Sequence, residues 1–212
     1  MAAIALATTA LLTSCASHSG GAAPSVSSAG IRGDQLSRPV PLSAQAHAAV
    51  FASTGGGTST LGQLQSGKLM LLYFGYTHCP DVCPTTMADL GQALRQLPSI
   101  DQAHTQVVFV TSDPARDSPA VMKTWLSNFD DNLILPFVGL TATLKQIDTV
   151  ATSVGVPLNP PVKEADGTIS VEHGAQTLAF VNGKASVLWL AGTTVGDYAH
   201  DIATLLTRVG TT

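Results

Sequence analysis

Two largely apolar runs stand out in the hydrophobic pattern of the chain, residues 69–76 (LMLLYFGY) and residues 106–113 (QVVFVTSD). A half-exposed strand alternates apolar and polar positions, so a run without alternation predicts a strand that is buried on both faces. Between the two runs, residues 85–97 carry apolar side chains at helical spacing, which predicts a helix. A strand, a helix and a second strand in this order predict a parallel strand pair.

Helix and hairpin signals follow the second run. A Ser-Pro pair opens residues 118–128 and is typical of a helix N-cap followed by proline at the first helical position. Residues 143–155 predict a helix that ends at a glycine, and residues 193–210 predict a closing amphipathic helix. Asn182-Gly183 lies between two apolar runs, which is a strong signal for a tight β-hairpin.

These elements predict an α/β domain with a thioredoxin-like fold. The parallel pair needs flanking helices, and the late hairpin adds antiparallel strands, so we expect a central mixed sheet. The glycines of residues 55–57, between two short strand candidates, predict an N-terminal β-hairpin. A length of 212 residues, of which 45% are hydrophobic, is sufficient for one such domain.

The first residues have the features of a targeting segment. An apolar stretch ends at Leu12-Thr13-Ser14-Cys15, which resembles a bacterial lipobox, in which the cysteine is lipid-modified and becomes the mature N-terminus. The stretch is too short to cross a bilayer as a helix. The alternative is an uncleaved apolar N-terminus with an accidental cysteine, because no Lys or Arg occurs before Arg32.

We therefore divide the chain into a lipoprotein signal at residues 1–15, a Ser-, Ala- and Gly-rich flexible linker at residues 16–34, and a thioredoxin-like domain at residues 35–212. This organisation predicts an exported protein of the bacterial cell envelope that Cys15 anchors on the periplasmic side of a membrane. The net charge of −4 and the lack of a Lys/Arg run give no reason to expect a nucleic-acid partner.

Cys79 and Cys83 carry the main chemical signal. They follow the first buried run directly, at the carboxyl end of a strand and before a helix, where α/β folds place their sites and where the helix field favours thiolate. In a helix, residues at this spacing have Cβ atoms about 5–6 Å apart, which suits a metal better than the roughly 3.5–4.5 Å of a disulfide. However, Pro84 disfavours helical backbone at Cys83, so we expect the helix to begin near Pro84, after a turn that could close a disulfide.

Two thiolates are too few for a closed zinc site, whereas soft thiolates at low coordination number favour Cu(I). A third ligand would be one of six histidines: His18, His47, His78, His104, His173 and His200. We place His173 beside the central sheet, just before the late hairpin, which makes it a candidate ligand. The alternative for any one of these histidines is an ordinary surface position.

The stretches YFGYTHCPDVCPTTM and VTSDPARDSPAVMKTWL closely resemble two signatures of the Sco/SenC family of copper-binding proteins. The resemblance implies a thioredoxin-like fold and copper bound by two CxxxC cysteines and a distant histidine. It also implies assembly of the binuclear copper site of cytochrome c oxidase subunit II. The implied partners are this subunit or another copper-receiving client, together with other copper chaperones or thiol reductants.

Position by position, the resemblance assigns Cys79, Cys83 and His173 as ligands of copper, as Cu(I) with Cu(II) as a second state, and the two cysteines as a redox-active pair. The residues Val-Glu-His-Gly at positions 171–174 differ from the family's Val-Asp-His-Ser-like string. The difference leaves His173 in place and changes the neighbouring side chains that would position it. Asp81, Asp113 and Asp117 are expected either around the ligands or as turn and helix-cap residues.

Two functions are compatible with these residues. The first is a copper metallochaperone, which is not an enzyme. The alternative is a thiol-disulfide reductase that acts on the copper-site cysteines of a client protein and does not need His173.

Overall fold

The computed structural model describes residues 30–163, 165, 169–171 and 173–209. The described residues from Ile31 onward form one compact unit. Cys15 and the signal segment lie outside the described residues, so the predicted lipid anchor stays a prediction. In the part of the chain that the structure describes, no helix is both long enough and apolar enough to span a bilayer.

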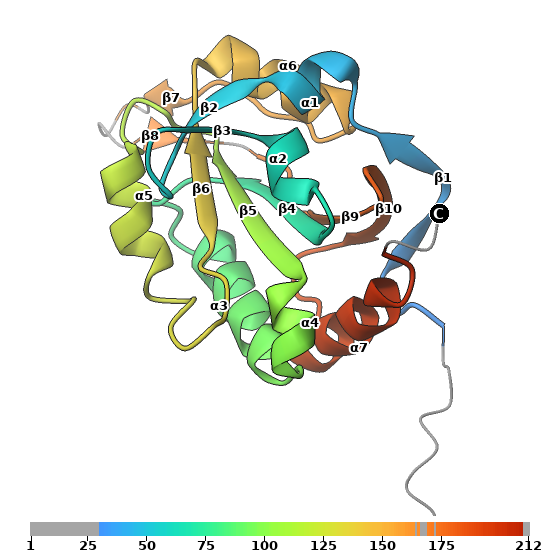
Figure 1. The fold of residues 1–212 in the computed structure, drawn as a ribbon. Helices are drawn as coiled ribbons and strands as arrows, with labels where there is room; N and C mark the ends of the chain where they lie inside the picture. The colour runs from blue at the N-terminus through green and yellow to red at the C-terminus, as the bar shows by residue number, and fades with distance from the viewer. Residues whose placement is uncertain (1–29, 164, 166–168, 172, 210–212) are drawn as a thin grey trace, which may run out of the picture. The chain divides into compact units, whose positions relative to one another are not determined.

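The predicted elements occur in the predicted order, and the structure adds further short elements among them, such as β1, α1, α2 and α4 (Figure 1). The helices are α1 (Ala44–Ala48), α2 (Leu61–Gln65), α3 (Val82–Arg95), α4 (Ser99–Ala103), α5 (Pro119–Leu126), α6 (Leu144–Ser153) and α7 (Val195–Leu206). The strands are β1 (Asp34–Pro41), β2 (Val50–Ser53), β3 (Thr58–Thr60), β4 (Leu69–Gly75), β5 (Thr105–Thr111), β6 (Val138–Thr141), β7 (Val162–Lys163), β8 (Ile169–Ser170), β9 (Thr177–Val181) and β10 (Lys184–Trp189).

Most of the strands join one mixed sheet, in the order β1-β10-β9-β4-β5-β6-β2-β3. The pairs β4–β5 and β5–β6 are parallel, and the other pairs of this sheet are antiparallel. Every residue of β4 and β5 is buried, as their unbroken apolar pattern predicted. The β2–β3 pair is the predicted N-terminal hairpin. This hairpin, the central mixed sheet and its flanking helices confirm the predicted thioredoxin-like α/β fold.

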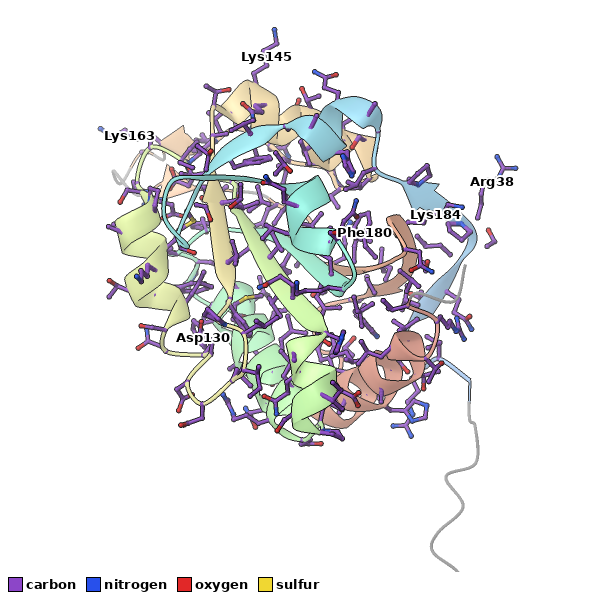
Figure 2. All side chains as sticks on the ribbon, in the orientation of Figure 1. Arg38, Asp130, Lys145, Lys163, Phe180 and Lys184 are labelled. Atoms are coloured by element: carbon purple, nitrogen blue, oxygen red, sulfur yellow. The ribbon has the colours of Figure 1, made fainter. Side chains whose placement is uncertain are left out.

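Helices cover both faces of the sheet. One buried cluster joins α3, α5 and α7 to one face, and a second joins α1, α2 and α6 to the other. Alternate residues of β4 enter the two clusters, with Tyr73 in the first and Phe74 in the second. In Figure 2, Phe180 lies inside the second cluster, whereas Lys145 and Lys163 extend away from the body. The cysteines and Tyr73 therefore belong to the layer that contains α3.

The helix after the cysteine motif begins earlier than the sequence predicted. We expected its start near Pro84, but α3 begins at Val82 and includes Cys83 in its first turn. The expectation was wrong because the first N–H groups of a helix have no intrahelical partner, so a proline in the first turn breaks no hydrogen bond. Two other predicted boundaries are confirmed: Ser118 caps α5, and Asn182 and Gly183 take the positive φ angles of a tight hairpin, 48° and 79°.

The chain joins the folded body inside the stretch that we assigned to the linker. The backbone N–H groups of Arg32 and Gly33 donate to the Asp201 carboxylate over 2.8–3.1 Å. The Trp189 indole N–H donates to the same carboxylate over 2.9 Å. Asp201 is fully buried, so this one carboxylate ties the start of β1 to β10 and α7.

Replacing Asp201 by alanine leaves three donors without this acceptor, one of them the indole N–H of the buried Trp189. We therefore expect the free energy of unfolding to fall by about 3 kcal/mol. Urea unfolding of the metal-free protein measures this change. Arg32→Ala is the matched control, because it removes only the exposed ion pair with Asp197 and keeps the backbone donor. We expect the control to cost less than about 1 kcal/mol; equal losses in the two variants would contradict the role of Asp201.

Candidate metal centre

Three predicted ligands from distant parts of the chain converge at the carboxyl end of β4. Cys79 lies in the turn after β4, where its N–H donates to the Tyr76 carbonyl over 3.2 Å. Cys83 lies in the first turn of α3, and His173 lies between β8 and β9. One ligand atom from each lies within 4.8 Å of the others. Both cysteines are free thiols.

The spacing of these atoms fits a small metal ion. The Cys83 Sγ and His173 Nε2 atoms lie 3.3 Å apart. A metal bound at about 2.3 Å from sulfur and about 2.0 Å from nitrogen separates the two donors by roughly 3.5–4 Å. A shift of a few tenths of an ångström therefore admits an ion. Two thiolates and one imidazole form a soft donor set, which suits Cu(I).

The surroundings of His173 prepare its Nε2 atom for coordination. Leu158 and His173 form an isolated β-bridge, and the Gly174 N–H donates to the Pro157 carbonyl over 3.1 Å. The Nδ1 atom lies 3.4 Å from the Gly174 carbonyl, which favours the tautomer with the proton on Nδ1 and a free lone pair on Nε2. Burial lowers the pKa of His173 and so favours the neutral ring that a ligand needs.

Two tyrosines border the same imidazole. The ring of Tyr76 meets it edge-on with centroids 5.6 Å apart, and the ring of Tyr73 does so at 6.0 Å. The guanidinium of Arg116 lies over the Tyr76 ring, 6.0 Å from its centre. The imidazole is thus held in an aromatic pocket whose walls come from β4 and the turn after it.

Cys83 is the more deeply placed sulfur. Its side chain is fully buried, whereas Cys79 is 9% exposed. Burial raises the pKa of the Cys83 thiol, and hydrogen bonds from the Tyr76 backbone amide and the Tyr73 hydroxyl act in the opposite direction. Burial is the larger effect. Without metal, Cys83 therefore keeps its proton at neutral pH, and coordination as thiolate releases this proton.

Gly75 allows the Cys83 sulfur to lie against β4. A Cβ atom at position 75 would lie 2.8 Å from Cys83 Sγ and 2.7 Å from a ring carbon of Tyr73. Both distances are shorter than van der Waals contact. The sequence did not predict Gly75, Tyr73 and Tyr76 as site residues, although all three directly precede the cysteine motif, because this stretch has the pattern of an ordinary buried strand.

The three predicted aspartates have different roles. Asp81 is exposed at the N-cap of α3 and makes no side-chain cap hydrogen bond. Asp113 is buried and pairs with Arg116. Neither belongs to the group of three ligand atoms.

Asp117 holds the loop that leads to Cys79. Its fully buried carboxylate accepts hydrogen bonds from the Thr77 N–H (3.0 Å), the Thr77 hydroxyl (2.6 Å) and the Thr111 hydroxyl (2.7 Å). The neighbouring His78 is half-exposed, with Nδ1 3.1 Å from the Thr77 hydroxyl, and does not join the metal ligands. Asp117 therefore positions the start of the cysteine motif from the segment after β5.

Comparisons with known proteins agree with this geometry. A sequence profile of the family described as SCO1/SenC matches residues 50–207. A Stutzerimonas stutzeri protein named "Putative copper-binding protein" is 37% identical over 121 residues, which are 57% of this chain and 56% of that protein. SCO1 of Saccharomyces cerevisiae is 39% identical over 95 residues, 45% of this chain and 31% of that protein. The chain thus matches about half or less of the length of these two relatives.

Solved structures resemble the chain over a larger share. Copper-bound ScoI of Bradyrhizobium japonicum is similar with a TM-score of 0.65 and 30% identity, covering 80% of this chain and 98% of that one. Metal-free Sco1 of Thermus thermophilus is similar with a TM-score of 0.67 and 31% identity, covering 82% and 96%.

Gly75→Ala should disturb the centre through the clash with Cys83 and Tyr73. We expect the free energy of unfolding to fall by about 1–3 kcal/mol through overpacking, together with weaker Cu(I) binding. Gly55→Ala is the control, since its added Cβ would meet only Ser53 Oγ at 3.6 Å. Thermal unfolding and a chelator competition titration measure both effects. Wild-type metal affinity in a folded Gly75→Ala protein would show that this contact is dispensable.

Cu(I) affinity should rise with pH, because the protonated Cys83 thiol must lose its proton on binding. At least one proton released per ion raises the affinity by about tenfold per pH unit, between about pH 6 and about pH 8. Competition against a chelator of known pH dependence measures this slope. The slope should become shallower in Cys83→Ser; a pH-independent affinity in the wild type would contradict the protonated state that we assign to Cys83.

Proposed function

The chain belongs to the SCO1/SenC family, and on this premise we propose that it is a copper metallochaperone whose cargo is Cu(I), held by Cys79, Cys83 and His173. The convergence of these three ligand atoms within 4.8 Å carries the proposal. The donors come from a turn, a helix and a loop that are separate in sequence, so their meeting is a property of the fold rather than of the motif. Their softness and small number match Cu(I) better than zinc.

Loading requires the reduced dithiol. Both sulfurs must be free to coordinate, so oxidation to a disulfide blocks uptake. Cys83 loses its proton and the neutral Nε2 atom of His173 completes a three-coordinate site. Tyr73 and Tyr76 keep the imidazole oriented, and the Asp117 hydrogen bonds keep the Cys79 turn in place.

Delivery proceeds by ligand exchange at the outer side of the site. Cys79 is the sulfur nearer to the surface, so an incoming thiolate or thioether of a client approaches the ion beside Cys79. A three-coordinate ion can accept a fourth donor before it gives up one of its own. The buried Cys83 and the partly buried His173 then release the ion last.

We propose the binuclear copper site of cytochrome c oxidase subunit II, or another copper-receiving protein, as the destination. The protein would receive copper from other chaperones, and thiol reductants would keep its cysteines reduced. The lipobox-like Cys15 supports an anchored position on the periplasmic side of a membrane in the bacterial cell envelope.

A thiol-disulfide reductase acting on a client's copper-site cysteines is the second candidate. The observation that favours it is the pair of free, neighbouring thiols. The raised pKa of the buried Cys83 thiol argues against Cys83 as the attacking nucleophile, which leaves Cys79 for that step. This function leaves the position and tautomer of His173 without a role.

The decisive experiment titrates the reduced full-length protein with Cu(I) against a competing chelator under anaerobic conditions. We expect one ion per chain. Cys79→Ser, Cys83→Ser and His173→Ala should each weaken binding by more than the roughly 10–100-fold that is typical of residues behind a ligand. His104→Ala is the control, because His104 is exposed at the end of α4.

The same variants separate the two candidate functions. A metallochaperone loses client metallation with His173→Ala, whereas a reductase keeps its dithiol activity in that variant. If the wild-type protein takes up no stoichiometric Cu(I), the metallochaperone proposal fails.

A further inference from the structure

Tyr73 places a polar group behind the candidate metal ligands. Its side chain is fully buried on β4, and its ring stacks on Phe109 with centroids 6.1 Å apart. A buried hydroxyl needs a hydrogen-bond partner. The Tyr73 hydroxyl donates to the Cys83 Sγ atom over 3.6 Å, so its partner is one of the two ligand sulfurs.

We propose that Tyr73 is a positioning residue that orients the Cys83 sulfur through this hydrogen bond and thereby favours Cu(I) over Cu(II) in the centre. The inference rests on the proposed function, because it takes Cys79, Cys83 and His173 as copper ligands. It assigns the control of oxidation state to a residue that does not touch the ion.

The hydrogen bond acts on the copper through the charge on the Cys83 sulfur. A hydrogen bond to a thiolate withdraws electron density from the sulfur and makes it a weaker donor to a bound metal. Cu(II) depends more strongly on this donation than Cu(I) does, so the oxidised state loses more binding free energy. Hydrogen bonding around a ligand cysteine is an established means by which proteins tune copper potentials.

The burial of Tyr73 and Cys83 strengthens the effect of the hydrogen bond on the sulfur. Cys83 and Tyr73 are both fully buried, so water does not compete for the sulfur, and a hydrogen bond in such a medium is electrostatically stronger. The Tyr73 hydroxyl is thus paired with the sulfur away from solvent.

The geometry also restricts the effect of the Tyr73 hydrogen bond to the Cys83 sulfur, one of the two ligand sulfurs. Gly75 allows close packing of Tyr73 and Cys83, since both lie within 2.8 Å of the space that a Cβ at position 75 would take. Cys79 lies nearer to the surface. Cys83 is therefore the sulfur whose orientation and charge are determined from inside the protein.

The test compares the wild type with Tyr73→Phe, which removes only the hydroxyl. Both proteins are loaded with Cu(II) and, separately, with Cu(I). In the variant, we expect the sulfur-to-Cu(II) charge-transfer absorption to move to lower energy, because the sulfur orbital rises when the hydrogen bond is lost. We expect the ratio of the Cu(I) and Cu(II) dissociation constants to move about tenfold in favour of Cu(II), or about 59 mV for one electron.

Tyr198→Phe is the matched control, since Tyr198 is also buried but packs against Trp189, with ring centroids 5.2 Å apart. The band and the ratio should stay unchanged in this control. A Tyr73→Phe protein that binds copper with the wild-type band and ratio would overturn the inference and leave the proposed function intact. A wild type that binds no copper refutes the proposed function itself.

A second measurement tests the inference if the Tyr73→Phe protein does not fold. Replacing the three tyrosines of the chain by 3-fluorotyrosine keeps their size and makes each hydroxyl a stronger donor. The charge-transfer band should then move to higher energy, opposite to the effect of Tyr73→Phe. An unchanged band in the fluorinated, copper-loaded protein would overturn the inference.

Discussion

The position of the Cys83 sulfur, in the space that a side chain at position 75 of β4 would need, is the constraint on which the candidate metal centre depends. It requires a strand that runs into a helix after one short turn, and it leaves no room for a side chain at position 75. The proline in the first turn of α3 is compatible with this path, because no hydrogen bond is lost there. The sulfur is consequently fully buried, next to the imidazole of His173.

The rest of the fold supplies the remaining parts of the centre from separate layers. The parallel pairing of β4 and β5 brings the segment after β5 beside the cysteine turn, where Asp117 holds Thr77. The bridge between Leu158 and His173 brings the histidine to the same end of the sheet. Each donor is therefore positioned by a different tertiary contact, and all of these contacts meet at the carboxyl end of β4.

The sequence predicted the features that depend on local pattern. The buried strands β4 and β5 were predicted because their apolar runs do not alternate, and the late hairpin because Asn-Gly accepts positive φ angles. The cysteine pair was predicted from its spacing. His173 as their companion came from family resemblance, because it follows Cys83 by 90 residues and only the tertiary structure brings them together.

The features that the sequence did not predict depend on strand pairing and close packing. Strand β1 has a polar sequence and joins the sheet through backbone pairing with β10, so it carries no apolar signal. The start of α3 at Val82 contradicted a local rule about the residue before proline. Tyr73 resembled a core residue, since only its burial against Cys83 reveals that its hydroxyl faces a sulfur.

The register of the sheet has a consequence for how the molecule is oriented when its N-terminal side is held. Tyr73 pairs with Thr177, Thr177 with Trp189, and Leu188 with Asp34, so β1 begins at the same end of the sheet as the cysteines. Three strand spacings separate β1 from β4, which is roughly 14 Å. A restraint on the chain just before β1 therefore acts close to Cys79 and Cys83. It limits how far the end of the sheet that carries the two cysteines can turn or move from the restrained point.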